Sequence, residues 1–338
     1  MAIIRDYDVV IIGAGPAGMT AALYAGRAML RTAVLEAGLS GGELLRTEYL
    51  DDVIGFPMIK GDDLAQRFEE HAKKFGAHFM NFTNVTSVQK VDPEMFAIET
   101  DSGDVYMSPV VIVTSGGTPI KLGIPGELEY AGRGVSYCAI CDANFFKGET
   151  IAVVGGGDAA CEEADYLTRF ANKVYLIHRR NEFRASAVIQ KHVFANPKIE
   201  VVFNTVAEEV LGKKDGTMVG LRLRDVVTNE RRVLDVTGLF VFIGFKPNTD
   251  IIKGHYKHDP LGYVVTDAAM MSSIPGLFVA GDLRSQLTRQ VTTASGDATT
   301  AAIAADKYLK DLREARSSLE KAVEEAVQTS QINLGGWT

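Results

Sequence analysis

The fold is decided by Asp8-Val9-Val10-Ile11-Ile12-Gly13-Ala14-Gly15-Pro16-Ala17-Gly18, where a β-branched run leads directly into a glycine-rich turn. The run predicts a strand buried on both faces, and residues 19–30 predict the helix that follows. In a G-x-G-x-x-G turn, one glycine bends the chain, one lets the backbone approach a pyrophosphate, and one lets helix and strand pack closely. Gly13, Gly15, Ala17 and Gly18 are therefore predicted to hold a dinucleotide at the start of a helix.

The next predicted strand, residues 31–35, ends in an acid. Glu36 lies 23 residues after Gly13, close to the separation of about 20 that is typical of a ribose-binding carboxylate. A carboxylate at this place accepts a hydrogen bond from a free 2′-hydroxyl and repels a 2′-phosphate. The first site is thus predicted to bind FAD or NAD rather than NADP, and a plain glycine-rich turn is the alternative.

The same pattern occurs a second time, with a different ending. Residues 150–154 predict a strand, a G-x-G-x-x-A turn follows, and residues 161–167 predict a helix. The strand predicted at residues 173–177 ends in cations instead of an acid, and guanidinium groups match the geometry of the 2′-phosphate of NADPH. A solvated basic turn is the alternative. The predicted contacts are Gly155, Gly157, Asp158, Ala159, Ala160, His178, Arg179, Arg180 and Arg184.

Cys138 and Cys141 form a C-x-x-C pair shortly before the second turn. This spacing allows a reversible disulfide ring and typically lowers the pKa of one thiol. A structural zinc site needs four ligands, and Cys161 with the scattered histidines offers no partner set, so no metal is expected. Cys161 is expected to be a buried helix residue without a role. Two nucleotide sites and one dithiol are most simply explained by electrons passing from NADPH to FAD to the Cys138–Cys141 disulfide.

Composition restricts the function classes. The chain has 338 residues, 46% of them apolar, and a net charge of −8, so a globular protein with a proper core is expected and non-specific nucleic-acid binding is not. Alternating strand and helix signals indicate an α/β protein. Three cysteines suit a reducing compartment, and two acids in residues 1–8 do not suit a secretory signal. We therefore expect a cytoplasmic protein. Glycines interrupt the uncharged residues 9–26, so no membrane span is expected there.

With these motifs in place, the sequence resembles the low-molecular-weight NADPH-dependent thioredoxin reductases from about residue 7 to residue 312. The resemblance implies that Gly281 and Asp282 contact the ribityl and phosphate region of FAD, that Arg289 and Gln290 lie against the flavin, and that Gly116 is small because the cofactor is near. Further stretches that carry the resemblance are Ser40-Gly41-Gly42, Gly55-Phe56-Pro57, Ile124-Pro125-Gly126-Glu127, Ile243-Gly244-Phe245-Lys246-Pro247-Asn248-Thr249 and Gly276-Leu277-Phe278-Val279-Ala280. Gly41 and Gly42 are counted among the cofactor contacts.

The resemblance also implies an architecture. It has two Rossmann-like, three-layer ββα dinucleotide-binding domains, and the NADPH domain is inserted in a split FAD domain. Residues 1–119 and 249–314 form the FAD domain, residues 120–248 form the NADPH domain with the cysteine pair, and residues 315–338 form a tail. A hinge rotation brings the disulfide and the nicotinamide to the flavin in turn. A homodimer is implied as well.

The activity implied is an NADPH-dependent thioredoxin-disulfide reductase that acts on thioredoxin or a similar small redox protein. By resemblance, Cys141 faces the flavin, Cys138 attacks the partner's disulfide, and Asp142 donates and accepts protons. Three alternatives stay open at this point: an FAD-dependent dithiol oxidase, an enzyme that takes electrons from ferredoxin or another carrier, and a nucleotide-sensing protein without turnover. The intact second turn and its arginines count against the first two.

Several stretches depart from the family pattern. Ala143 replaces the usual glycine after the cysteine pair, and alanine tolerates a positive φ poorly, so the active-site turn is expected to differ. Ala159 replaces a hydroxyl residue in the second turn, which removes one hydrogen bond. In the tail, Leu319, Val323 and Val327 recur at helical spacing and predict a surface helix. The alternative for the tail is that Trp337 covers an apolar cleft, such as the flavin site.

Overall fold

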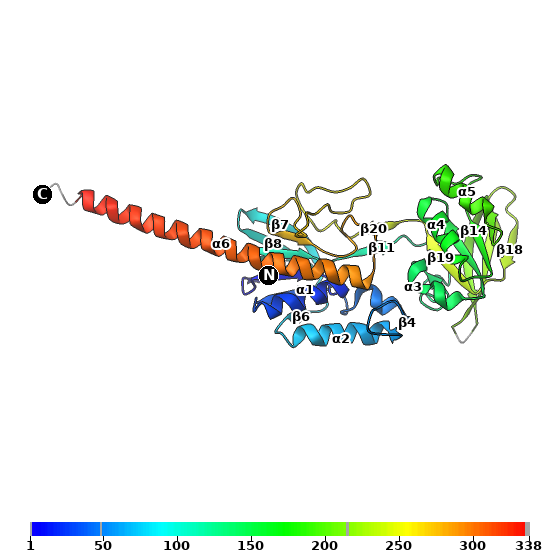
Figure 1. Ribbon diagram of the computed structural model, residues 1–338, viewed down its shortest axis with the longest axis horizontal. Coiled ribbons are helices and arrows are strands. Elements are labelled where there is room, and N and C mark those ends of the chain that lie inside the picture. Colours follow the sequence, from blue (N-terminus) through cyan, green and yellow to red (C-terminus); the bar gives the residue numbers. More distant parts are fainter. Residues whose placement is uncertain (1, 48, 214–215, 335–338) are drawn as a thin grey trace. The chain divides into compact units, whose positions relative to one another are not determined.

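The structure is a computed structural model that describes residues 2–47, 49–213 and 216–334 (Figure 1). For residues 324–326 and 328–334 only the helical backbone is described, and Trp337 lies outside the described residues. The chain divides into two compact units, each built from separate segments. Unit 1 comprises Met1–Gly42, Ala65–Gly116 and Pro247–Thr338, and unit 2 comprises Glu43–Leu64 and Gly117–Lys246.

A five-stranded parallel sheet of order β21-β10-β2-β3-β6 forms the centre of unit 1. Its strands are β2 (Val9–Ile12), β3 (Thr32–Leu35), β6 (His78–Met80), β10 (Val110–Val113) and β21 (Leu277–Val279). Every residue of β2, β3, β10 and β21 is buried, as expected for a parallel sheet covered on both faces. The predicted first strand, helix and second strand are confirmed as β2, α1 (Pro16–Arg27) and β3.

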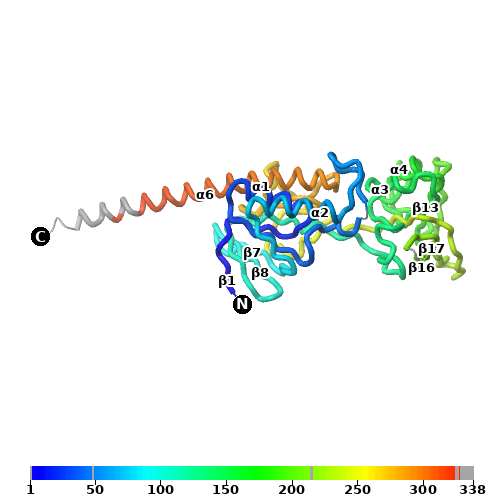
Figure 2. The backbone as a smooth tube through the Cα atoms, turned by 90° about the horizontal axis from the view of Figure 1, so that it is seen from below, coloured from blue at the N-terminus to red at the C-terminus, as the bar shows by residue number. Residues whose placement is uncertain are grey.

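Helices cover one face of this sheet and a second sheet covers the other. On the face of Val9 and Ile11, α1 and α6 (Val291–Leu334) pack through alanines such as Ala22 and Ala301. Both views show α6 alongside α1 (Figures 1 and 2). The opposite face packs against a sheet of order β1-β9-β8-β7. Its strands are β1 (Ile3–Ile4), β7 (Val85–Asp92), β8 (Met95–Thr100) and β9 (Val105–Ser108).

Unit 2 repeats this three-layer plan. Its parallel sheet has the order β12-β19-β13-β14-β15. The strands are β12 (Val135–Ser136), β13 (Thr150–Gly155), β14 (Lys173–Ile177), β15 (Ile199–Val202) and β19 (Gly238–Phe242). One face packs against α4 (Asp158–Leu167) and α5 (Ala187–Ala195). The other face packs against the antiparallel strands β16 (Thr205–Gly212), β17 (Met218–Asp225) and β18 (Arg231–Leu234).

Shorter elements complete the two units. Unit 2 also contains α3 (Ala139–Asp142) and the 3-10 turn η2 (Ala143–Phe146). The chain crosses between the units at β11 (Gly117–Pro119) and β20 (Phe245–Pro247), which pair with each other. The segment 43–64, which the predicted boundaries assign to the FAD domain, is grouped with unit 2. It holds η1 (Gly42–Arg46), β4 (Tyr49–Leu50), β5 (Ile59–Lys60) and the start of α2 (Gly61–Lys73).

The predicted α/β class with parallel sheets is confirmed. The predicted tail is not a separate element, because α6 continues through residue 315 without interruption and ends at Leu334. Leu319, Val323 and Val327 are exposed on this part of the helix, in agreement with a surface helix. None of the helices in the described part of the chain is both long and apolar enough to cross a lipid bilayer.

Candidate redox and dinucleotide sites

The first glycine-rich turn is held tightly at its outer glycines and is open at the middle one. Gly13 has a φ of +97°, and a Cβ there would lie 2.7 Å from the carbonyl oxygen of Thr114. A Cβ on Gly18 would lie 1.8 Å from the carbonyl oxygen of Gly13, so helix and turn are in direct contact. A Cβ on Gly15 would meet nothing closer than Gly42, at 4.0 Å. The backbone at Gly15 is therefore free to approach a pyrophosphate.

Other predicted residues of the first site gather around this turn. The Glu36 carboxylate accepts hydrogen bonds from the backbone N–H of Ala14, at 2.7 Å, and of Gly38, at 2.9 Å. Gly41 donates its N–H to the carbonyl of Ala14 at 2.8 Å. These contacts fix the carboxylate at the end of β3, beside the turn, and leave lone pairs that can accept from ribose hydroxyls.

The carboxyl ends of β10 and β21 contribute the remaining residues of this site. Gly116, with a φ of +60°, accepts a hydrogen bond from Asn248 N–H at 3.0 Å. Gly281 packs against Ala17, because a Cβ there would lie 3.0 Å from that methyl group. Asp282 follows Gly281 and accepts from Arg289 Nε through its backbone oxygen at 3.5 Å. These residues therefore lie beyond the carboxyl ends of the strands, where dinucleotides bind in open α/β sheets.

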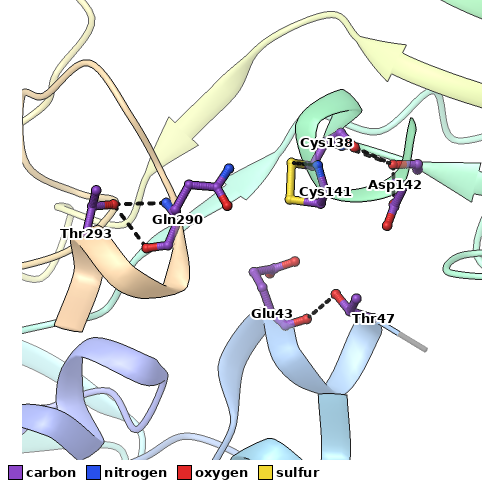
Figure 3. Close-up of a disulfide and its surroundings, with 8 residues drawn as sticks. Glu43, Thr47, Cys138, Cys141, Asp142, Gln290 and Thr293 are labelled. Carbon is purple, nitrogen blue, oxygen red and sulfur yellow. Dashed lines mark hydrogen bonds between the residues drawn. A yellow bond between two sulfur atoms is a disulfide. The ribbon is translucent and has the colours of Figure 1, made fainter. Parts of the chain in front are cut away.

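Arg289 and Gln290 lie just before α6. The Arg289 guanidinium stacks over the ring of Tyr263, 4.3 Å from its centroid. Gln290 N–H donates to the hydroxyl of Thr293, and that hydroxyl lies 3.0 Å from the Gln290 carbonyl (Figure 3). Both residues are only partly exposed. The Arg289 side chain and the Gln290 backbone are therefore held by neighbours on the same unit.

A residue that sequence analysis did not assign supports this region. The Asp297 carboxylate is buried at 8% exposure and accepts hydrogen bonds from Nε and Nη2 of Arg284, each at 3.0 Å. The same carboxylate accepts from Gly281 N–H at 3.3 Å, and Gln286 donates to the Gly281 carbonyl at 3.1 Å. Both backbone groups of Gly281 are thus held. Only the fold, which brings the start of α6 to the end of β21, reveals this contact.

The second turn has the same open middle position. A Cβ on Gly155 would lie 2.3 Å from the Ala160 methyl group, so this end of the turn packs on α4. No atom lies within 4 Å of a Cβ on Gly157. Asp158 and Ala159 are exposed at the first turn of α4. The five predicted residues of this turn therefore surround one accessible helix start, where a phosphate is favoured.

Three exposed guanidinium groups follow β14. Arg179, Arg180 and Arg184 are exposed, and none of them pairs with a carboxylate within the described residues. His178, by contrast, is 7% exposed, and its pKa is lowered by burial and by the three nearby arginines. The arginines can neutralise a phosphate, because their donors are available. His178 lies inside the unit, beneath them.

Cys138 and Cys141 are joined in a disulfide with their Cα atoms 5.4 Å apart (Figure 3). Cys138 precedes α3, and its Sγ accepts a hydrogen bond from Cys141 N–H at 3.2 Å. A hydrogen bond to sulfur stabilises the thiolate form. Cys161, the third cysteine, is fully buried in α4, and burial raises the pKa of its thiol to about 11, so it stays a neutral core residue as expected.

Asp142 carries the carboxylate nearest in sequence to the disulfide. Burial, together with the negative charges of Asp52 and Asp51, raises its pKa to about 6, although a hydrogen bond from Ser136 acts in the opposite direction. The Ser136 hydroxyl lies 2.5 Å from Asp142 Oδ2 and also accepts from Cys138 N–H at 3.1 Å. The carboxyl group therefore titrates near neutrality, as an acid and base in catalysis must.

The active-site turn forms without the backbone strain expected for Ala143. Ala143 has φ −53° and ψ −37°, in the right-handed helical region, and begins η2. Alanine is therefore accommodated, and the expected disturbance does not arise. Asn144 donates to Asp51 Oδ2 at 2.8 Å and ties the turn to the segment 43–64 of the same unit. That segment is held locally as well, since Thr47 donates to the Glu43 carbonyl (Figure 3).

Glu127 anchors the approach to the disulfide. Its carboxylate is 1% exposed and accepts from Leu122 N–H, Gly123 N–H and the hydroxyl of Tyr137 at 2.7–3.0 Å. Burial and the bond to Glu127 raise the pKa of the Tyr137 phenol, so it stays a donor. Tyr137 precedes Cys138, and this bond therefore fixes the chain on which the disulfide is mounted. The sequence motif contained Glu127 but gave no sign of this contact.

The residues present fit the two dinucleotides that the sequence predicts. The open backbone at Gly15 and Gly157 leaves room for two pyrophosphates. The acid at Glu36 suits a ribose with a free 2′-hydroxyl, as in FAD, and the unpaired arginines after β14 suit a 2′-phosphate. The two sites differ in charge in the direction that would separate FAD from NADPH.

Comparison with known proteins identifies the family. The sequence matches the pyridine nucleotide-disulphide oxidoreductases over residues 7–298. It is 42% identical to a thioredoxin reductase of Listeria monocytogenes over 311 residues, 92% of this chain and 96% of that protein. It is 40% identical to a thioredoxin reductase of Bacillus subtilis over 316 residues, 94% of this chain and 99% of that protein.

Solved structures agree. The thioredoxin reductase of Streptococcus pyogenes superimposes with a TM-score of 0.87 at 38% identity, covering 92% of this chain and 99% of that chain. The thioredoxin reductase of Giardia duodenalis gives a TM-score of 0.84 at 33% identity, covering 92% and 100%. The chain therefore belongs to the pyridine nucleotide-disulphide oxidoreductase family, as a flavoprotein disulfide reductase of the thioredoxin reductase type.

Proposed function

We propose that this chain reduces the disulfide of thioredoxin, or of a similar small redox protein, with electrons from NADPH. As a member of its family it uses FAD and NADPH, and the dithiol oxidase and ferredoxin-linked alternatives are not favoured. The single observation that carries the proposal is the Cys138–Cys141 disulfide in a chain with two dinucleotide turns of opposite charge.

We assign the residues to two cofactor sites. The FAD site comprises Gly13, Gly15, Ala17, Gly18, Glu36, Gly41, Gly42, Gly116, Gly281, Asp282, Arg289 and Gln290. The NADPH site comprises Gly155, Gly157, Asp158, Ala159, Ala160, His178, Arg179, Arg180 and Arg184. Bound FAD supplies the two-electron chemistry that links the nicotinamide to the disulfide. The residues themselves bind, orient and neutralise charge, and the two glycine turns place a pyrophosphate on a helix start in each site.

The dithiol passes the electrons on. Reduction of the Cys138–Cys141 disulfide takes up two electrons and two protons, and breaks the S–S bond. The Cys138 thiolate, which the N–H of Cys141 stabilises, attacks one sulfur of the acceptor disulfide and forms a mixed disulfide. The Cys141 thiolate then attacks Cys138, releases the acceptor as a dithiol and restores the internal disulfide. Asp142, with a pKa of about 6, can hold and release the proton that each thiol exchanges.

The domain organisation belongs to the same proposal. Residues 1–119 and 249–314 form the FAD domain, residues 120–248 form the inserted NADPH domain, and residues 315–338 form the tail, of which residues 315–334 extend the last helix. The three-layer plan of both units and the discontinuous make-up of unit 1 support this division. We further infer a homodimer, which the resemblance implies, and a cytoplasmic location, which suits a chain with three cysteines of which one is buried and unpaired.

The test is anaerobic stopped-flow absorbance of the FAD-loaded protein. Rapid loss of the oxidised flavin band on mixing with NADPH, and slow loss with NADH, is the expected result. A second mix with oxidised thioredoxin restores the band. A protein whose flavin is reduced by neither nucleotide, or whose reduced form does not react with any thioredoxin-like disulfide, would disprove the proposal.

Arg180→Ala provides the matched variant for the donor. Removing one unpaired guanidinium should weaken NADPH binding by about tenfold and leave NADH binding nearly unchanged, because only NADPH carries the 2′-phosphate. Arg133→Ala is the control, since Arg133 is an exposed arginine of the same unit that lies outside the predicted site. Equal loss for both nucleotides would place the 2′-phosphate elsewhere.

A further inference from the structure

The second nucleotide turn and the arginine-bearing segment after β14 are joined by direct bonds. Arg184 N–H donates to the carbonyl of Gly156 at 2.7 Å, and Ser186 N–H donates to Asp158 Oδ1 at 2.6 Å. One partner of each bond lies in the glycine turn or at the start of α4. The other lies in residues 179–186, which carry the three arginines. The place of the arginines is therefore set by the turn that is expected to hold the pyrophosphate.

Asp158 occupies a particular place in this connection. It is the first residue of α4, and among the described residues its side chain makes no hydrogen bond within α4 itself. Its Oδ1 instead accepts from Ser186, the residue that precedes α5. A carboxylate that accepts a backbone N–H makes a charge-assisted hydrogen bond, which is stronger than a neutral one. The Asp158 carboxylate therefore binds a backbone group of the protein, although the sequence pattern counts this residue among the cofactor contacts.

His178 supports the turn from below. A Cβ on Gly156 would lie 2.2 Å from His178 Nδ1, so the imidazole fills the space under that glycine. The ring also lies 5.6 Å from that of Phe183, measured between centroids, with the two planes tilted by 41°. Its Nε2 is buried and has no hydrogen-bond partner among the described residues. A ring enclosed in this way positions the turn instead of reaching out to a phosphate.

From this geometry we propose that Asp158 is a positioning residue that sets the preference for NADPH over NADH by holding the arginine segment against the nucleotide turn. The inference rests on the proposed function, in which the arginines bind the 2′-phosphate. His178 acts with Asp158 as a spacer beneath Gly156. Within the NADPH site, both residues act in this role through the placement of Arg179, Arg180 and Arg184.

The proposal separates two kinds of contact. The part of the nucleotide that NADPH and NADH share is expected to bind to the backbone of the turn and of the start of α4. A change of the Asp158 side chain leaves this backbone in place. The 2′-phosphate rests on the arginine segment, whose bond at Ser186 depends on the Asp158 oxygen. Loss of that oxygen should therefore weaken NADPH much more than NADH. The side-chain amide introduced by Asp158→Asn keeps an oxygen acceptor at the same place, so this variant should retain most of the preference.

The chain offers a matched control on the same two helices. Asp165 Oδ1 accepts from Asn196 Nδ2 at 2.8 Å and joins the end of α4 to the residue after α5, far along both helices from the turn. Asp165→Ala removes a bond between the same elements. It should lower stability to a similar degree without changing the choice of nucleotide.

The experiment measures the nucleotide concentration that gives half-maximal flavin reduction for wild type, Asp158→Ala, Asp158→Asn and Asp165→Ala, with NADPH and with NADH. Wild type is measured first: if it shows no preference for NADPH, the proposed donor fails before the variants are considered. Asp158→Ala is expected to weaken NADPH by about tenfold and NADH less than about twofold. Thermal unfolding of each variant gives the structural effect separately.

The outcomes are distinct. A collapsed preference in Asp158→Ala with a retained preference in Asp165→Ala and Asp158→Asn supports the proposal. Equal weakening of both nucleotides by Asp158→Ala would show that Asp158 serves their shared part, and an unchanged preference would show that the arginines are placed without it. Either result overturns the positioning role. When Arg179, Arg180 and Arg184 are all replaced by alanine, Asp158→Ala should change the preference no further, because Asp158 acts only through the placement of these three guanidinium groups.

Discussion

The raised pKa of Asp142 gives a prediction with a defined sign and size. In the folded chain this pKa is about 6, against an ordinary value of 3.8. The folded state therefore binds the proton more tightly than the unfolded state, and stability from this group falls as pH rises between these values. At 1.36 kcal/mol per pKa unit, the charged carboxylate costs about 1.5 kcal/mol at pH 5 and about 3 kcal/mol at pH 8.

Asp142→Asn removes that charge and keeps an oxygen that can accept from Ser136. The variant should therefore be more stable than wild type, by about 1.5 kcal/mol at pH 5 and about 3 kcal/mol at pH 8. Urea unfolding followed by far-ultraviolet circular dichroism at both pH values measures the difference. Asp235→Asn is the control, because Asp235 is an exposed acid of the same unit.

The decisive quantity is how much the difference in unfolding free energy between Asp142→Asn and wild type changes from pH 5 to pH 8. A gap that stays constant, or an Asp142→Asn variant that is less stable than wild type at pH 8, would refute a buried carboxyl that titrates near neutrality. The hydrogen bond from Ser136 lowers the pKa of Asp142, so Ser136→Ala should raise it further. In steady-state thioredoxin reduction, the pH limb that Asp142 controls should then move to higher pH.

Three further predictions follow from contacts described above. Gly156→Ala should destabilise the chain by about 1–3 kcal/mol, since its methyl group would meet His178. Gly157→Ala should leave stability unchanged and weaken the binding of both NADPH and NADH. Thermal unfolding and NADPH titration distinguish the two variants. Asp297→Asn leaves the partly buried Arg284 guanidinium without its charge partner, at a cost of about 1.5–3 kcal/mol, and should reduce the FAD retained on gel filtration; retention equal to wild type would contradict the role given to Asp297. Cys141→Ser should keep flavin reduction by NADPH and abolish thioredoxin reduction, and residual turnover at the wild-type rate would rule out the dithiol as the carrier.

Local sequence patterns predict those parts of the fold that neighbouring residues determine. β2, β3, β13 and β14 are apolar runs that end at a glycine or a charge, and the structure confirms them with nearly the same bounds. The helix after each glycine turn was predicted for the same reason. These signals are strong because a strand buried on both faces needs an unbroken apolar run.

Such local patterns do not predict contacts between residues that lie far apart in the sequence. Asp297 and Gly281 are brought together by the packing of α6 on the sheet, and nothing in their local sequence indicates the bond. The bond from Ser136 to Asp142 crosses two cysteines and depends on the turn at α3. Resemblance to a family suggests flavin contacts but does not reveal that Asp158 accepts from Ser186 or that His178 lies under Gly156, because a motif lists residue types and does not say which partner each side chain takes.

The way in which unit 1 is built determines the order in which the two units can fold during synthesis. Its sheet needs β21 beside β10, and its helical layer needs residues up to Leu309 against α1. Asp8, next to β2, also pairs with Arg313 at 2.8 Å. The sheet of unit 2 ends with Phe242 and can close while those residues are still inside the ribosome. Unit 2 can therefore fold before unit 1 during synthesis, because the sheet and helical layer of unit 1 are complete only after translation has passed Leu309.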